Sequence, residues 1–403
     1  MPQRSLGEWL SYLEQLHPNP IDLGLARVGE VAGRLGLLQP EPTVVTIAGT
    51  NGKGSSSAVL EAIAMDAGRR VGVFTSPHLL HYNERIRIDG KPVGDLAIIA
   101  AFQAIEEARG ELSLTYFEFG ALAALWVFAR QPLDLLVLEV GLGGRLDAVN
   151  IIDADLAIIT SISLDHEAWL GSDRETIGGE KAGILRPGIT AVIADPDPPR
   201  SVADRLAKLG CDASFYAVDE HAGLAGRSAL RPENVFAGRE AAARLGMTVD
   251  DARLEQLLAE LVVPGRLQRL QHQGRPVVLD VAHNPAAIAN LLAWLEREVP
   301  GPRLALFAVL SDKDIHAMIP PCSAAFAHWF LPALPGVSRA LPAGAVAGVL
   351  EETGVHQVSL CDGMAEAWQA AQAWGEEGTV VVFGSFYTVA GFMELLGEGP
   401  DKA

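Results

Sequence analysis

The stretch from residue 43 to residue 60 constrains the fold more than any other part of this 403-residue chain. It reads TVVTIAGTNGKGSSSAVL: a β-branched apolar run over Thr43–Ala48, a glycine-rich break, and then a helical pattern of apolar positions. This order is typical of a buried parallel strand, a loop and a helix in an α/β fold. Glycines let backbone N–H groups face an anion, and a lysine at the helix mouth can reach terminal phosphates. The stretch therefore predicts a phosphate-binding loop.

The loop departs from the common nucleotide-binding pattern. In that pattern a serine or threonine follows the lysine directly, but here Gly54 separates Lys53 from Ser55. The hydroxyl that usually holds magnesium is displaced, so we expect a metal ligand elsewhere in the chain. A glycine-rich turn with an incidental lysine is the simpler alternative, which the position of Lys53 between two glycines at the helix mouth disfavours. The residues assigned to ATP in this loop are Gly49, Thr50, Asn51, Gly52, Lys53, Gly54 and Ser55.

The loop sequence resembles the nucleotide loop of the Mur ligase superfamily. Its greatest likeness is to the folate branch, the dihydrofolate synthases and folylpolyglutamate synthases. Other segments resemble that branch in the same order along the chain: Asp-Leu-Gly-Leu at 22–25, Thr-Ser-Pro-His at 75–78, the run from 138 to 152, and Leu-Asp-Val-Ala-His-Asn-Pro at 279–285. The resemblance covers nearly the whole chain, so chance similarity explains it poorly.

Length and composition restrict the possible classes of protein. A chain of 403 residues is long enough for two or three domains, and a net charge of −19 should repel nucleic acid and anionic membranes. The three cysteines, Cys211, Cys322 and Cys361, lack metal-type spacing, which argues against a zinc site or a disulfide framework. No apolar run approaches the roughly 18 residues of a membrane span, and the N-terminus lacks a signal-peptide pattern. We therefore expect a cytoplasmic protein.

The pattern of strands and helices restarts near residue 266. Residues 263–266 (Val-Pro-Gly-Arg) are turn formers between a helix and a strand, as expected of a domain hinge. Beyond them, apolar strands alternate with helices, which predicts a smaller α/β domain with a mainly parallel sheet. We predict an ATP- and pterin-binding domain over 1–265, like the P-loop ATPase-like central domain of Mur ligases. A Rossmann-like α/β domain over 266–403 would be the glutamate ligase domain.

Side chains at strand ends are candidate magnesium ligands. Glu139 closes the apolar strand predicted over 134–140, and α/β proteins bind ligands at the carboxyl ends of central strands. Ser76 follows the strand predicted over 71–75, where it could equally cap a turn before proline. His166 follows the strand predicted over 156–162, where a lone histidine is more often structural. The resemblance implies that Ser76 and Glu139 hold one Mg²⁺ and that His166 holds a second.

Lys181 lies near the end of a predicted helix. In Mur-type ligases the corresponding lysine is carbamylated by carbon dioxide, which replaces a cation with an anionic oxygen ligand. The resemblance implies the same N6-carboxylysine here, and Lys53, Lys181 and His166 would then be the catalytic residues. Carbamylation requires a neutral amine, so the surroundings of Lys181 should lower its pKa. An unmodified Lys181 that binds phosphate is the alternative.

The segments that resemble a pterin pocket have simpler interpretations when taken alone. Asp22 reads most simply as a helix N-cap, and Thr115 with Glu118 as capping beside core aromatics. In the folate ligases that make dihydrofolate, the matching segments line the pterin pocket. The resemblance therefore assigns the following residues to the pterin or folate: Asp22, Leu23, Gly24, Leu25, Ala26, Thr115, Tyr116, Phe117, Glu118, Leu146, Asp147 and Ala148.

Further ATP contacts are implied outside the loop, at Asn234, Arg266 and Asp280, which match nucleotide-site residues of the family. Lys313, Asp314 and the Gly-Ser-Phe at 384–386 lie at predicted strand ends, and are weaker candidates for holding the incoming glutamate.

The resemblance implies an amide-forming ligase that joins L-glutamate to dihydropteroate and to reduced folates through an acyl phosphate. Its co-substrate would be ATP, and its cofactors would be Mg²⁺, at two sites, and the carbamate on Lys181. We expect a monomer whose partners are these small molecules, with no nucleic acid or membrane. The alternatives are a folylpolyglutamate synthase only and, less in keeping with the motifs, a P-loop kinase or regulatory ATPase. A cell-wall Mur ligase is disfavoured because the loop near residue 49 leaves no room for the extra N-terminal domain.

Overall fold

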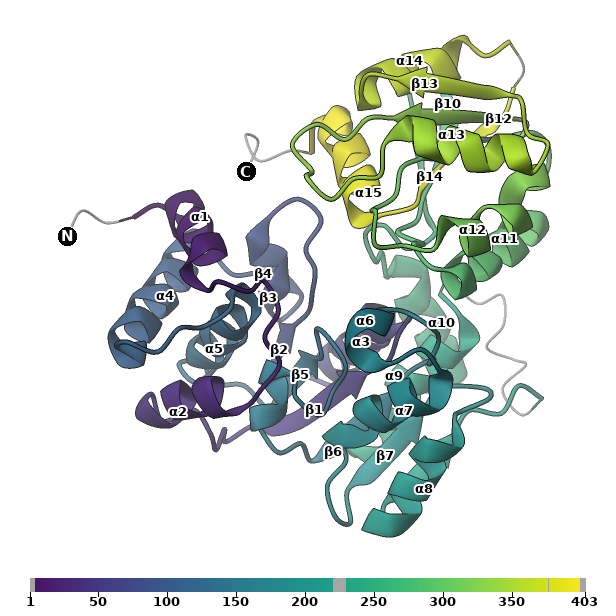
Figure 1. The fold of residues 1–403 in the computed structure, drawn as a ribbon. Coiled ribbons are helices and arrows are strands. Elements are labelled where there is room, and N and C mark those ends of the chain that lie inside the picture. The colour runs from purple at the N-terminus through teal and green to yellow at the C-terminus, as the bar shows by residue number, and fades with distance from the viewer. Residues whose placement is uncertain (1–3, 220–229, 376, 399–403) are drawn as a thin grey trace. The chain divides into compact units, whose positions relative to one another are not determined.

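The computed structural model describes residues 4–219, 230–375 and 377–398 (Figure 1). The chain divides into two compact units: unit 1 comprises Met1–His78 and Tyr82–Leu261, and unit 2 comprises Leu79–His81 and Val262–Ala403. Each unit is an α/β structure around its own sheet, so the expected α/β class with two sheets is confirmed. Each unit is described by itself below.

Unit 1 is built on an eight-stranded sheet in the order β4-β3-β2-β5-β1-β6-β7-β8. The strands are β1 Thr43–Ala48, β2 Val71–Phe74, β3 Ile86–Ile88, β4 Lys91–Pro92, β5 Leu135–Glu139, β6 Leu156–Ile159, β7 Thr190–Ile193 and β8 Asp212–Phe215. All pairings are parallel except those of β3 with β2 and β4. The strand predicted to precede the nucleotide loop, β1, lies between β5 and β6, so the loop emerges at the centre of the sheet.

The α-helices of unit 1 are α1 Leu6–Leu16, α2 Ala26–Arg34, α3 Lys53–Asp66, α4 Asp95–Arg109, α5 Tyr116–Phe128, α6 Glu167–Leu170, α7 Arg174–Lys181, α8 Arg200–Leu209, α9 Pro232–Arg244 and α10 Asp251–Glu260. Its 3-10 helices are Tyr82–Arg85, Ala148–Ile151 and Ala182–Ile184. In the sequence, Leu6, Trp9, Leu10, Leu13 and Leu16 fall on one face of a helix over 6–16, and the structure confirms these bounds as α1, with a Ser5–Glu8 capping box and Leu6, Trp9 and Leu13 buried. The sequence from 219 to 228 is loop-like, and beyond Asp219 it lies outside the described residues.

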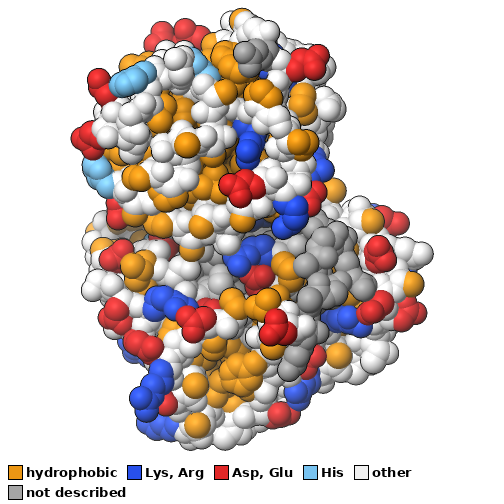
Figure 2. All heavy atoms as spheres, turned by 90° about the vertical axis from the view of Figure 1, so that its right-hand side faces the viewer, with side chains coloured by type: hydrophobic (Ala, Val, Ile, Leu, Met, Phe, Trp, Pro, Cys, Tyr) orange, Lys and Arg blue, Asp and Glu red, His pale blue; other side chains and the backbone are white. Residues whose placement is uncertain are grey.

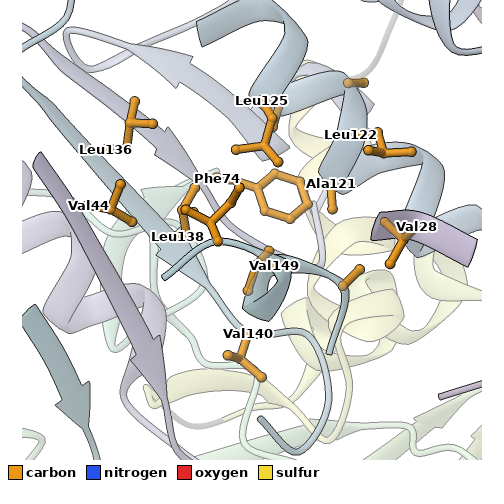
Figure 3. Close-up of a cluster of buried hydrophobic side chains, with 14 of the residues drawn as sticks. Val28, Val44, Phe74, Ala121, Leu122, Leu125, Leu136, Leu138, Val140 and Val149 are labelled. Carbon is orange, nitrogen blue, oxygen red and sulfur yellow. The ribbon is translucent and has the colours of Figure 1, made fainter. Parts of the chain in front are cut away.

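The sheet of unit 1 is covered on both faces. Consecutive residues of a strand point to opposite faces, yet Val137 and Leu138 are 0% and 1% exposed. On one face, the ring of Phe74 lies among Leu138 and the α5 side chains Ala121 and Leu125 (Figure 3). The covered central strands therefore expose only their ends and loops to a ligand.

Unit 2 contains a six-stranded sheet in the order β13-β12-β11-β14-β10-β9, in which only β9 is antiparallel. Its strands are β9 Gln268–His272, β10 Arg275–Leu279, β11 Arg303–Phe307, β12 His328–Pro332, β13 Val358–Cys361 and β14 Thr379–Phe383. Its helices are α11 Pro285–Glu298, α12 Ile315–Met318, α13 Ala343–Glu352, α14 Met364–Ala373 and α15 Phe386–Met393, with a 3-10 helix at Pro320–Ala325 and a π-helical turn at Glu394–Glu398. The mainly parallel second sheet is thus confirmed.

The surface mixes side chains of both signs. On the face drawn in Figure 2, acidic side chains are scattered among basic and apolar ones rather than gathered in one patch. The three cysteines are free thiols, so the expected lack of a disulfide framework is confirmed. Among the described residues, no helix is both long and apolar enough to span a membrane.

Candidate active site

The nucleotide loop leaves β1 and leads directly into α3. Gly52, the residue before the helix, has a φ of 96°, which L side chains rarely adopt, so glycine is favoured there. The loop is held from the end of β6, because the Thr50 N–H donates to the Ser161 carbonyl at 2.7 Å. The hydroxyls of Ser161 and Thr50 donate in turn to the carbonyls of Asn51 and Ser163, each at 3.0 Å. The residues after β6 thus fix the shape of the loop.

Two lysine amines converge on one carbonyl of the loop. Lys53 Nζ donates to the carbonyls of Gly49 at 3.0 Å and Thr50 at 3.2 Å. Lys181 Nζ, from the last residue of α7, donates to the same Gly49 carbonyl at 2.9 Å. Residues 132 positions apart are therefore brought together at the loop. This arrangement concentrates positive charge where an anionic ligand would lie, in a chain whose net charge is −19.

Lys181 is 4% exposed, and its surroundings lower its pKa to about 7. The main cause is burial, which disfavours the charged ammonium, and the nearby charge of Lys53 lowers the pKa further. The charges of Asp165 and Asp147 act in the opposite direction. A substantial fraction of this amine is therefore neutral near pH 7, as carbamylation requires.

Ser76 and Glu139 lie together at the ends of the adjacent strands β2 and β5. The Ser76 N–H donates to Glu139 Oε2 at 3.4 Å, and Glu139 is 4% exposed. Glu139 Oε2 also lies near the loop, 3.7 Å from where a Cβ on Gly54 would be. Hydroxyl and carboxylate oxygens are suitable ligands for Mg²⁺, which usually takes few protein ligands and completes its coordination with water and phosphate. This fits the finding that the described residues contain no group of three or more His, Cys, Asp or Glu side chains able to hold a metal ion.

His166 occupies an unusual backbone position. Its φ of 53° is left-handed, and it is the N-cap residue of the one-turn helix α6. The His166 side chain is exposed, and the His166 backbone N–H donates to Asp165 Oδ1 at 2.9 Å. Asp165 is also the acid whose charge acts on Lys181. His166 is thus linked to the loop region through its neighbour.

Sequence reasoning missed the ion pair that holds the segment leading to His166. Asp195, 4% exposed, accepts the Ile162 N–H at 2.7 Å, and Arg174 Nε donates to the Ile162 carbonyl at 2.9 Å. Arg174 and Asp195 approach each other to 3.5 Å. The available signal was an acid soon after an apolar strand, since Asp195 follows β7.

Asn234, in the first turn of α9, lies against the loop. A Cβ added to Gly52 would collide with the Asn234 side-chain amide, so the two residues are in close approach. The helix that carries Asn234 is packed tightly on α3, because a Cβ on Gly238 would collide with Val59. The structure therefore places this predicted ATP contact beside the predicted loop.

The first two pterin-like segments are joined by Arg27, which sequence reasoning also missed. Arg27 Nη1 donates to Asp22 Oδ2 at 2.7 Å, and Nη2 is 3.2 Å from Glu118 Oε1. The N-cap interpretation of Asp22 is wrong: the N-cap of α2 is Leu25, without a side-chain hydrogen bond, because α2 begins only at Ala26. The capping interpretation of Thr115 and Glu118 is confirmed by a complete capping box at α5.

The third pterin-like segment is shaped by Asp147. Its carboxylate accepts the N–H groups of Gly141 and Leu142, each at 2.9 Å, and of Val149 at 3.0 Å. Burial is the main cause that raises the pKa of Asp147 to about 6, against the effect of these donors. The Phe117 ring packs on Gly141 so closely that a Cβ there would collide with it. Asp147 therefore shapes the glycine loop beside the second pterin-like segment.

The remaining pterin-site candidates lie in the same three segments. Leu23 and Gly24 are half-buried between α1 and α2, Tyr116 is the first residue of α5, Leu146 is half-buried, and Ala148 is buried at the start of a 3-10 helix.

In unit 2, Arg266 and Asp280 lie close together. Asp280, 9% exposed at the end of β10, accepts the N–H of Leu267 at 2.9 Å and of Ala282 at 2.8 Å. Burial raises the pKa of Asp280, whereas the charge of Arg266 lowers it. The Arg266 guanidinium lies 5.2 Å from the centroid of the Phe386 ring, a cation–π arrangement.

The weaker candidates for a glutamate site in unit 2 have local roles. Asp314 caps α12 by accepting the Ala317 N–H at 3.0 Å, and Ser385 caps α15 by accepting the Thr388 N–H at 3.0 Å. Lys313 Nζ lies 3.6 Å from Asp312 Oδ2, and its side chain is 10% exposed. These contacts account for the residues structurally and leave the glutamate assignment a prediction.

Comparison with known proteins gives matches over the whole chain. Residues 265–386 match the family model described as Mur ligase, glutamate ligase domain. A dihydrofolate synthase/folylpolyglutamate synthase of Escherichia coli (strain K12) is 44% identical over 410 residues, covering 97% of this chain and 95% of that protein.

Solved structures agree. E. coli FolC in complex with DHPP and ADP has a TM-score of 0.90 and 42% identity, with 99% of each chain covered. A bifunctional folylpolyglutamate synthase/dihydrofolate synthase with Mn, AMPPNP and L-glutamate bound has a TM-score of 0.88 and 41% identity, with 98% of each chain covered.

Proposed function

The chain belongs to the dihydrofolate synthase/folylpolyglutamate synthase family, and we propose that it ligates L-glutamate to dihydropteroate and to reduced folates at the expense of ATP. The first reaction forms dihydrofolate and the second forms folylpolyglutamates. The observation that carries the proposal is the convergence, in unit 1, of the nucleotide loop, the Ser76–Glu139 pair and the glycine loop after Glu139. That glycine loop packs on Phe117 of a pterin-like segment, so the phosphate and acceptor regions are continuous.

The chemistry follows from the difficulty of making an amide from a carboxylate. A carboxylate oxygen of the acceptor attacks the γ-phosphorus of ATP, ADP leaves, and the product is an acyl phosphate. The neutral amine of glutamate then attacks the acyl carbon, and phosphate leaves with formation of the amide bond. Lys53 and the loop N–H groups neutralise the charge that develops on the transferred phosphoryl group. The half-buried setting of the loop strengthens these interactions.

Ser76 and Glu139 have the donor chemistry of a magnesium site. Mg²⁺ held by these two residues would offset the negative charge of the ATP phosphates. A relative has been crystallised with Mn, AMPPNP and L-glutamate bound. A second ion at His166 is part of the proposal; His166 directly follows Asp165, whose charge acts on Lys181.

We further propose that Lys181 is carbamylated. Its neutral amine nitrogen attacks the carbon of CO₂, an N–C bond forms, one proton is released, and the cation becomes an anion. The lowered pKa supports this step, and the adjacent Lys53 would stabilise the anion. The carbamate nitrogen keeps one N–H, which can still donate to the Gly49 carbonyl that Lys53 also binds. An unmodified Lys181 that binds phosphate directly is the alternative.

The two units would have different roles. Residues 1–265 would bind ATP and the pterin, and residues 266–403 would serve as the glutamate ligase domain. Arg266 and Asp280 would add ATP contacts to those of Asn234. The expected monomer and the cytoplasmic location remain predictions.

The test is ADP formation with ATP and Mg²⁺, adding dihydropteroate, tetrahydrofolate and L-glutamate singly and in pairs. Turnover that requires dihydropteroate and glutamate supports the first activity, and turnover with tetrahydrofolate and glutamate supports the second. Turnover with tetrahydrofolate but not with dihydropteroate would limit the function to folylpolyglutamate synthesis. ADP release independent of glutamate would instead indicate a kinase or regulatory ATPase.

A further inference from the structure

The segment between α1 and α2 has little regular structure, and side chains of Arg27 and His17 contact it at Asp22. Residues 17–25 contain no helix or strand, although they include most of the first pterin-like segment. Arg27 Nη1 binds the Asp22 carboxylate at 2.7 Å, and Nη2 binds the Asp22 carbonyl at 3.0 Å. His17 Nε2 approaches the same carboxylate at 3.5 Å. The position of this segment therefore depends on Asp22 and on the guanidinium that holds it.

Arg27 is itself held in place by its neighbour. Val28 is fully buried, and it lies beside Ala121 and Leu122 of α5 in the core (Figure 3). This contact fixes the first turn of α2 against α5. The Arg27 backbone is consequently held against α5, the helix that carries Glu118 in its first turn.

Glu118 makes different contacts with its two carboxylate oxygens. Oε2 accepts the Thr115 N–H at 2.7 Å, and Oε1 lies 3.2 Å from Arg27 Nη2. The Glu118 side chain is 4% exposed, and a buried carboxylate is costly without a cationic partner. Arg27 supplies that cation while it also binds Asp22. One planar guanidinium thus joins two segments that are 91 residues apart.

We infer that Arg27 is a positioning residue for the pterin-bearing acceptor: it holds residues 22–26 and 115–118 in the relative arrangement that binds this substrate. The inference rests on the proposed function. Without Arg27, the 17–25 segment must be ordered when the acceptor binds, and that cost weakens acceptor binding. ATP binding should change little, because hydrogen bonds from the end of β6 hold the nucleotide loop independently of Arg27.

The test compares Arg27→Ala and Arg27→Lys with Arg34→Ala in the full-length enzyme. Arg34 is a matched control because it lies on the same helix and also joins it to another segment, through the carbonyls of Ala108 and Arg109. We expect Arg27→Ala to raise the KM for dihydropteroate about tenfold or more, with the KM for ATP within about twofold. Arg27→Lys should raise this KM less than Arg27→Ala does. An ammonium keeps the positive charge but lacks the planar guanidinium geometry that binds Asp22 and Glu118 together. Arg34→Ala should leave the acceptor KM unchanged.

Thermal unfolding and a double-mutant cycle separate positioning from general destabilisation. If Arg27 acts through Asp22, the effects of Arg27→Gln and Asp22→Asn on acceptor KM will be strongly non-additive. A wild-type enzyme that uses neither dihydropteroate nor tetrahydrofolate would overturn the proposed function, and the inference with it. An active wild type whose Arg27 variants keep the acceptor KM, or raise the KM for ATP equally, would overturn the inference alone.

Discussion

The strand ends of the two sheets carry similar residue types and use them differently. At the ends of β1, β2 and β5 in unit 1, the structure gathers the Lys53 and Lys181 amines and the Glu139 carboxylate around a glycine loop. At the end of β10 in unit 2, the oxygens of the buried Asp280 carboxylate accept backbone N–H groups. Asp314 and Ser385 cap helices in the same unit.

This contrast shows that a polar residue after a parallel strand is not by itself a mark of chemistry. Acids that accept backbone N–H groups fix the course of the chain, and Asp147 does so within unit 1 as well. Catalytic potential is better indicated where charges of both signs are buried around a loop, as at Lys181. We therefore expect substitutions at the unit 1 edge to affect kcat, and those at Asp280 to affect stability more than kcat, with its proposed ATP contact acting on the KM for ATP.

The largest effect is expected for Glu139→Gln. The amide keeps the size of the side chain but removes the negative charge proposed to hold Mg²⁺, and losing several kcal/mol of transition-state stabilisation corresponds to roughly 10³-fold in kcat. The effect is measured as the rate of ADP formation at increasing Mg²⁺ concentration. Glu167→Gln, which changes an exposed glutamate, is the control. Unchanged turnover and Mg²⁺ affinity would remove Glu139 from the site.

A smaller effect is expected for Gly52→Ala, compared with Gly68→Ala at the other end of the same helix. Both glycines have positive φ, 96° and 75°, but only at Gly52 would a Cβ meet another residue, Asn234. Alanine would therefore strain the backbone in both variants, but only Gly52→Ala would also displace the loop. We expect the KM for ATP to rise about tenfold or more for Gly52→Ala and to stay near wild type for Gly68→Ala. Equal effects would show that strain alone is being measured.

Asp280→Asn should reduce turnover less than Glu139→Gln does, and its main effect should be a loss of stability. An amide nitrogen placed opposite one of the two backbone N–H donors loses a hydrogen bond, which costs about 1–3 kcal/mol. We expect a lower midpoint of thermal unfolding, with kcat reduced less than tenfold. Asp314→Asn is the control, because asparagine caps helices as well as aspartate does. If Asp280→Asn instead abolished turnover as Glu139→Gln should, the contrast between the two sheet edges would fail.

The fold was predictable where local signals were strong. The apolar run of β1, the glycines of the loop and the apolar face of residues 6–16 indicated β1, α3 and α1 from residues alone. The strands β3 and β4 are three and two residues long, too short to show a periodicity, and were missed. β9 was also missed, because four of its five residues are polar or charged, QRLQH, and give no apolar pattern.

The candidate site was predictable in part. The strand-end position indicated Glu139 and the glycine loop indicated Lys53 on physical grounds, whereas the roles of Ser76, His166, Lys181, Asp22 and Asn234 came from resemblance. Arg27 and the Arg174–Asp195 pair were missed. The position of Asp195 after an apolar strand was a signal, but no local pattern pairs it with Arg174, or pairs Arg27 with Glu118, which lies 91 residues away. A helix pattern also could not show that α2 begins after Asp22, since the segment before it is held by a side chain and not by a cap.

Burial of the Lys181 amine lowers the stability of the folded protein by an amount that depends on pH. Its pKa is lowered to about 7 in the folded protein and is about 10.4 in an unfolded chain, so the unfolded state binds more protons between these pH values. Stability due to this group therefore rises with pH across the window, by up to about 1.4 kcal/mol per pH unit, and the cost of burial is fully present below pH 7. In CO₂-depleted buffer, Lys181→Met should unfold at a higher temperature than wild type near pH 7, by a few degrees, with a gap that narrows towards pH 10. The exposed Lys208→Met should show no such gap. A Lys181→Met gap that does not change with pH would mean that the amine is not held neutral by burial, which would also remove the basis for its carbamylation.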